Sequence, residues 1–121
     1  MGMGEMARTF EDLVVWQKAH ALALEVCRAT ARFLKEEIAG LISQLRRAAV
    51  SGASNLVEGF NRNGKADKRK FYNHAGASIE ETRYQLMPAH DLNFAETIHL
   101  QEACREVTRI LPSNVRSMKS A

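Results

Sequence analysis

The amount of apolar surface on the first long helical segment, residues 10–35, constrains the fold more than any other feature of the sequence. At 100° per residue its polar side chains occupy one arc, and apolar side chains fill the remainder. The apolar arc is roughly twice the about 100° that a simple core-facing helix shows. One side can pack inside a bundle, and the other needs a partner, so we expect the chain to assemble with copies of itself. The residues expected at that oligomer interface are Val15, Trp16, Leu22, Val26 and Phe33.

Three further helical segments are expected, at about residues 37–61, 66–90 and 95–111. Their apolar residues recur at spacings of three and four, and short turn signals separate them. Pro88 and Pro112 are expected to kink or end the third and fourth helices. Helices of this length with short connections predict an all-α, antiparallel up-down-up-down four-helix bundle. We expect a single domain over residues 10–117, a disordered N-terminal segment at 1–9 and a frayed tail at 118–121.

Small residues mark two places where helices are expected to cross closely. Gly52 and Gly59 in the second segment each cost about 1 kcal/mol of helix propensity relative to alanine. The compensation expected for that cost is the close approach of a neighbouring backbone. Residues 75–78 of the third segment are likewise all small, which suits a tight crossing.

A row of polar side chains runs along one face of the second segment at helical spacing. It can either bind a ligand or an RNA strand, or form a buried network that fixes helix register and subunit geometry, and we prefer the network. A buried polar group left unpaired costs about 1–3 kcal/mol, and a contact from Arg47 to Glu80 or Glu81 would pair it. The expected structural polar network comprises Gln44, Arg47, Ser51, Asn55, Glu58, Glu80 and Glu81.

The positive charge of the chain is concentrated in residues 62–70. The net charge is +3, and this stretch holds five of the 17 basic residues but one of the 14 acidic residues. Three of the bases fall near the first turn of the third helix, where the helix dipole favours acids. The placement breaks a local rule, which hints at function, although a charge run can also be merely a solvated face. Helical phase puts Phe71 in the core and leaves Tyr72 to stack on a base. The candidate nucleic-acid-binding residues are therefore Arg62, Lys65, Lys68, Arg69, Lys70 and Tyr72.

The remaining patterns argue against an enzyme, a cofactor or a metal site. The four histidines are scattered, and no phosphate-binding loop, nucleophile motif or paired carboxylates are present. Cys27 and Cys104 lack metal-ligand spacing, so free thiols are expected rather than a disulfide or a metal site. No apolar run approaches the roughly 18 residues of a membrane span. We therefore expect a cytoplasmic protein with no catalytic residues, cofactor, metal or membrane partner.

Three sequence blocks resemble a known family. These blocks are FEDLVVWQKAHALALEV, SQLRRAAVSGASNLVEGFNR and KFYNHAGASIEETRYQL. They are similar to signature blocks of the four-helix-bundle proteins encoded by intervening sequences of bacterial 23S ribosomal RNA genes. The resemblance covers about residues 10–111, and the middle block is the most specific. Two departures are the missing proline in residues 33–40 and the insertion of Ala77 between Gly76 and Ser78.

The resemblance implies a ring-shaped homopentamer of antiparallel four-helix bundles. A more distant relative that the resemblance brings in, the accessory protein of diversity-generating retroelements, uses a similar basic pentameric barrel to bind nucleic acid and a reverse transcriptase. The expected function is a non-enzymatic oligomeric module that binds RNA or DNA through its basic patch. The alternative is an adaptor that docks a protein partner, such as a nucleic-acid enzyme, without binding nucleic acid itself.

Overall fold

Four α-helices and no strands make up the part of the chain that the structure describes, which confirms the all-α fold. The computed structural model describes residues 7–33 and 38–120, with side chains described as far as residue 111. A short 3-10 helix, η1 (Phe10–Asp12), precedes the α-helices. The α-helices are α1 (Val14–Thr30), α2 (Ala39–Asn61), α3 (Lys65–Asp91) and α4 (Ile98–Ser120).

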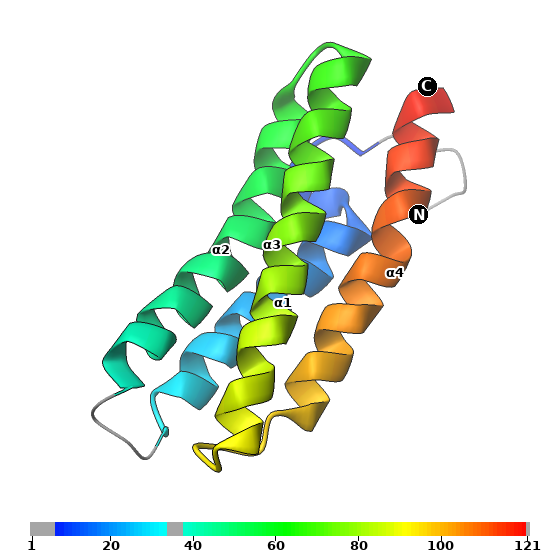
Figure 1. Cartoon of the computed structure of the whole chain (residues 1–121). Coiled ribbons are helices and arrows are strands. Elements are labelled where there is room, and N and C mark those ends of the chain that lie inside the picture. The colour runs from blue at the N-terminus through cyan, green and yellow to red at the C-terminus, as the bar shows by residue number, and fades with distance from the viewer. Residues whose placement is uncertain (1–6, 34–37, 121) are drawn as a thin grey trace.

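The four helices lie side by side around one core (Figure 1). The connection between α2 and α3 lies at one end of the molecule, and the connection between α3 and α4 lies at the other (Figure 1). Contacts join α1 to α2, α2 to α3, α3 to α4 and α4 back to α1. None of the helices in the described residues is long and apolar enough to cross a membrane.

The first α-helix begins later than the sequence pattern predicts. The Asp12 carboxylate accepts hydrogen bonds from the backbone N–H groups of Arg8 and Thr9, which closes a separate turn. Leu13 is then extended, so α1 starts at Val14. This helix ends at Thr30, and the predicted continuation to residue 35 lies partly outside the described residues, as do residues 1–6 and 121 of the expected disordered and frayed ends.

Of the two alternatives expected at each proline, a kink or an end of the helix, the end is wrong at both. Pro88 lies inside α3, which continues to Asp91, and α4 continues past Pro112 to Ser120. Pro88 is tolerated because it falls in the last turn of α3. Proline has no N–H group, so the carbonyl of Tyr84 loses its helical donor, and Tyr84 is exposed. The chain then reverses through Asn93, which has a positive φ of 64°. The hydroxyl of Thr97 donates to the carbonyl of Leu86 at 2.6 Å and fixes the start of α4.

Gly52 and Gly59 of α2 lie against α3 as expected, but the atoms nearest to them belong to side chains and not to the neighbouring backbone that the sequence pattern predicts. A Cβ atom at Gly52 would collide with the side chain of Ile79, and one at Gly59 would lie 2.7 Å from the Tyr72 ring. Gly76 is similarly close to Leu111 of α4. The small residues of α2 and α3 therefore make room for large side chains of the facing helix.

The predicted oligomer interface is wrong for three of its five residues. Val15, Leu22 and Val26 are buried in the core of the single chain, so they cannot line a contact with another copy. The apolar arc of α1 is wide because this helix packs against both α2 and α4. Trp16 and Phe33 are partly buried against the core, and the Trp16 ring stacks on His20 with centroids 4.8 Å apart.

Candidate nucleic-acid interface

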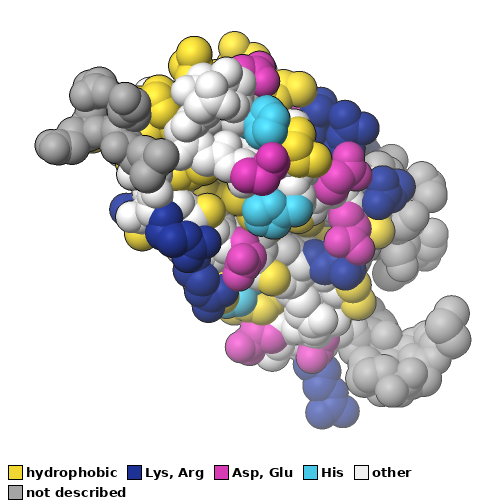
Figure 2. Space-filling view, turned by 90° about the horizontal axis from the view of Figure 1, so that it is seen from below, with side chains coloured by type: hydrophobic (Ala, Val, Ile, Leu, Met, Phe, Trp, Pro, Cys, Tyr) yellow, Lys and Arg dark blue, Asp and Glu magenta, His cyan; other side chains and the backbone are white. Residues whose placement is uncertain are grey.

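The basic residues 62–70 lie at the turn between α2 and α3 and in the first turns of α3. We call this region the hairpin tip, and it forms one end of the molecule (Figure 1). Viewed from the opposite end, acidic and histidine side chains gather on the surface, with separate Lys and Arg side chains around them (Figure 2). At that end the Nδ1 atom of His90 lies 3.3 Å from the Glu96 carboxylate.

Lys68 has a structural role in the hairpin tip. Its Nζ atom donates to the carbonyl oxygens of Gly59, at 3.2 Å, and Phe60, at 2.7 Å. These carbonyls belong to the last turn of α2, where the helix leaves acceptors unpaired and the dipole favours a cation. Partial burial lowers the pKa of Lys68. The unfavourable position of this base at the start of α3 is therefore compensated by the end of α2.

Arg62 is also engaged within the chain. Its guanidinium pairs with the Glu58 carboxylate at 2.7 Å and lies over the Phe71 ring, 4.4 Å from the centroid. The side chain of Arg62 is still 42% exposed, so it is not enclosed by these contacts. Arg62 thus links the end of α2 to the second turn of α3.

Lys65, Arg69 and Lys70 are the exposed bases of the hairpin tip. Within the described residues their side chains make no hydrogen bond or ion pair. The Nζ atom of Lys70 lies over the Phe71 ring, 5.8 Å from the centroid. Asp67 is exposed among them and is the single acid of the segment. Because their charges are not neutralised internally, these three residues are the strongest candidates for contacts with phosphate.

The prediction that Tyr72 is the exposed aromatic residue is wrong. Tyr72 is 2% exposed and fills the space that Gly59 leaves on α2, whereas Phe71 is partly exposed. Burial raises the pKa of the Tyr72 hydroxyl, which has no hydrogen-bond partner among the described residues. The pairing of a glycine with a large ring on the next helix was the signal that could have assigned Tyr72 to the core.

The polar row of α2 forms separate local contacts rather than one buried network. The hydroxyls of Ser51 and Ser78 lie 3.0 Å apart and join α2 to α3, and the Asn55 amide donates to the carbonyl of Ser51. Arg47 is exposed, and its guanidinium donates to the side-chain oxygen of Gln44 at 3.4 Å.

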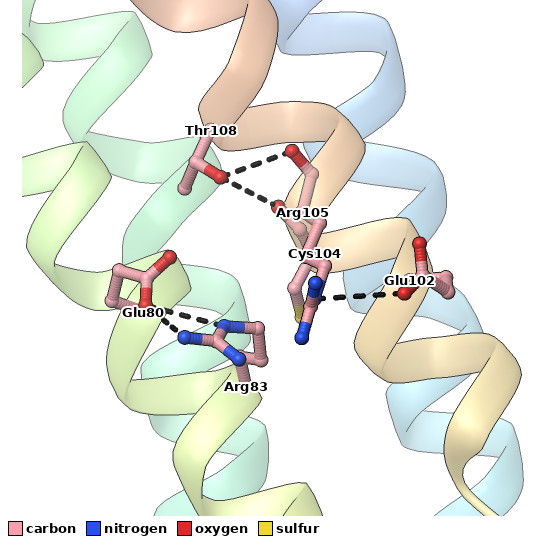
Figure 3. Close-up of polar contacts among 6 residues, drawn as sticks. All are labelled: Glu80, Arg83, Glu102, Cys104, Arg105 and Thr108. Atoms are coloured by element: carbon pink, nitrogen blue, oxygen red, sulfur yellow. Dashed lines mark hydrogen bonds and ion pairs between the residues drawn. The ribbon is translucent and has the colours of Figure 1, made fainter.

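The predicted contact from Arg47 to the third helix is absent among the described residues. Glu80 pairs instead with Arg83 at 2.9 Å, and Glu81 accepts a hydrogen bond from Gln85. The Glu80–Arg83 pair lies on α3, facing the part of α4 that carries Cys104 (Figure 3). Partners three or four residues away on the same helix were within easy reach, which explains why the longer contact does not form.

Neither thiol is part of a described metal site or disulfide. Cys27 and Cys104 are free, and no group of three or more potential metal ligands occurs within the described residues. Burial, with a further contribution from the nearby Glu80 carboxylate, raises the pKa of Cys104 to about 12. A thiol with that pKa stays protonated and is a poor nucleophile at neutral pH.

Sequence analysis also missed a polar clamp between α1 and α2. The Nε atom of Arg46 donates to the Thr30 hydroxyl at 2.8 Å, and its NH2 group reaches the carbonyl of Cys27 at 3.4 Å. Arg46 thereby stabilises the end of α1, as Lys68 stabilises the end of α2. Both are bases that lie against the C-terminus of a neighbouring helix, where the dipole favours positive charge.

The two kinds of base in the hairpin tip predict different effects on stability. Lys68→Met keeps the apolar stem but removes the two hydrogen bonds to α2, so we expect it to lower the free energy of unfolding by about 1 kcal/mol. Lys65→Met removes the same charge from an exposed site and should change it by less than about 0.5 kcal/mol. Urea unfolding at one protein concentration measures both. Equal effects of the two substitutions would contradict the structural role of Lys68.

Comparison with known protein families matches most of the chain to one family. Residues 11–113 match the family described as 23S rRNA-intervening sequence protein. No curated protein matches the chain. The match spans the region from η1 to the middle of α4, and thus includes the hairpin tip and the whole described core. The chain therefore belongs to the 23S rRNA-intervening sequence protein family.

Proposed function

We propose that the protein is a non-enzymatic, homo-oligomeric module that binds RNA or DNA through the hairpin tip. The observation that carries this proposal is the set of three exposed bases, Lys65, Arg69 and Lys70, whose side chains make no hydrogen bond or ion pair within the described chain. Such bases bind phosphates and release condensed counterions, which gives affinity without base specificity. The free cysteines suit a cytoplasmic location for this activity.

The binding proposal predicts a strong dependence on salt. Lys65→Glu combined with Arg69→Glu should weaken binding to a labelled oligonucleotide by about tenfold or more near 50 mM salt. The slope of the logarithm of affinity against the logarithm of salt concentration should fall by the contribution of about two phosphate contacts. Lys68 is left intact because its loss would disturb the fold. A filter-binding titration at two salt concentrations provides the measurement.

A matched control changes the charge by the same amount elsewhere. Arg28→Glu combined with Arg105→Glu alters two exposed bases that lie outside the hairpin tip. This control should retain most of the affinity. The proposal fails if the wild-type protein does not bind at low salt, or if the two double variants lose affinity equally.

We also propose that the chain is an antiparallel up-down-up-down bundle that assembles into a ring, with five subunits implied by the family resemblance. The interface is reassigned to the outer sides of α1 and α2. Val14 and Leu24 of α1 are 54% and 41% exposed, and Val50 of α2 is 49% exposed. Exposed apolar side chains on adjacent helices are suited to contact with another copy. A ring would present several hairpin tips together, which increases avidity for one strand.

Replacing apolar residues of the reassigned interface with glutamate tests the assembly proposal. Leu24→Glu combined with Val50→Glu should reduce the mass in solution from an oligomer to a monomer, because two carboxylates would be desolvated at each contact. Tyr84→Glu replaces a side chain that is 66% exposed on α3 and should leave the mass unchanged. Sedimentation velocity at micromolar concentration measures all three proteins. A wild-type monomer would contradict the assembly.

A second candidate function is an adaptor that docks a protein partner, such as a nucleic-acid enzyme. The exposure of Tyr84 and Leu92, at 66% and 62%, favours this candidate because both lie toward the end of α3 that is remote from the hairpin tip. An adaptor would use these apolar side chains and would show no affinity for oligonucleotides. The salt titration therefore separates the two functions.

A further inference from the structure

Planar side chains form a cluster beside the exposed bases of the hairpin tip. The guanidinium of Arg62 covers the Phe71 ring at 4.4 Å, and the His74 ring lies 6.0 Å from Phe71 at an interplanar angle of 55°. Lys70 approaches the same ring at 5.8 Å. Phe71 and His74 are three residues apart on α3 and therefore share one face of the helix. The cluster thus combines three planar groups with an adjacent cation.

Part of this cluster remains available to a ligand. Phe71 is partly exposed and His74 is exposed, and His74 makes no hydrogen bond or ion pair within the described residues. The Arg62 side chain is 42% exposed even though it pairs with Glu58. A flat, uncharged group can therefore lie against the guanidinium or the imidazole without displacing a contact inside the chain.

The local acids make the cluster better suited to a base than to a phosphate. Glu58 pairs with Arg62, and Asp67 is exposed on α3 one turn before Phe71. Both carboxylates offset the positive charge of Arg62 and Lys70 beside the rings, so a phosphate gains little directly over them, and neither carboxylate opposes an uncharged base there. Phosphates of the same strand are instead attracted to Lys65, Arg69 and Lys70. The surface therefore separates positions for phosphates from positions for bases.

From this arrangement we infer that the hairpin tip prefers single-stranded nucleic acid, with unpaired bases stacked on the Arg62–Phe71–His74 cluster. This inference rests on the proposed function and adds the class of strand that the site takes. Bases within a duplex are already stacked on their neighbours, so their faces cannot reach the cluster. Stacking on arginine and aromatic planes is tolerant of sequence, because every base has a π-face.

The experiment compares strands and one exposed side chain by fluorescence anisotropy. Labelled single strands of DNA and RNA of about 12 nucleotides, a length within the usual site sizes, are titrated with the protein. A duplex of the same DNA sequence is titrated in parallel. We expect the wild type to bind at least one single strand about tenfold or more tightly than the duplex. His74→Ala should weaken single-strand binding about fivefold or more, because stacking contributes that much per base, and should leave duplex binding unchanged. The DNA and RNA arms identify which strand is preferred.

His99→Ala is the matched control, because His99 is an exposed histidine near the start of α4, outside the cluster. This control should bind both kinds of strand as the wild type does. Equal affinity for single strand and duplex, or no effect of His74→Ala on single-strand binding, would overturn the preference while leaving phosphate binding by the exposed bases intact. Failure of the wild type to bind any of the oligonucleotides would overturn the proposed function as well.

Discussion

The close packing of α2 on α3 is the constraint on which the rest of the structure depends. Gly52 and Gly59 leave no side chain where the two helices meet, and Ile79 and Tyr72 fill those positions. Interiors tolerate few voids, so a large side chain opposite a glycine fixes the register of the pair. At Gly59 this packing also brings the end of α2 within reach of Lys68.

This register divides the basic residues of the hairpin tip into two groups. Lys68 donates to the carbonyls at the end of α2 and Arg62 covers Phe71, so both stabilise the turn. Lys65, Arg69 and Lys70 remain exposed. A turn that is held by these contacts and presents exposed cations loses less conformational freedom on binding than a basic segment without such contacts would. The proposed binding function therefore follows from packing as much as from charge.

The sequence predicts the helical class, the free thiols and the close contacts at the glycines, because these follow from spacing and residue type. The exchange of Phe71 and Tyr72 between core and surface could not be predicted from helical phase alone. The two residues are only 100° apart, and the space at Gly59 decides between them. Periodicity likewise shows that α1 is widely apolar but not which side meets α2, α4 or another copy. Arg47 was misplaced because a long side chain can reach several partners.

The most direct measurement of the central constraint is the stability of alanine variants at two glycines of α2. Gly59→Ala should lower the free energy of unfolding by about 1–2 kcal/mol, because the added methyl group meets the buried Tyr72 ring. Gly40→Ala, with no atom of the described residues within 4 Å of the new Cβ atom, should be neutral or stabilising by up to about 1 kcal/mol. Urea unfolding of both variants at equal protein concentration compares them. A Gly59→Ala variant as stable as the Gly40→Ala variant would show that α2 and α3 do not pack so closely at Gly59 that a side chain is excluded there.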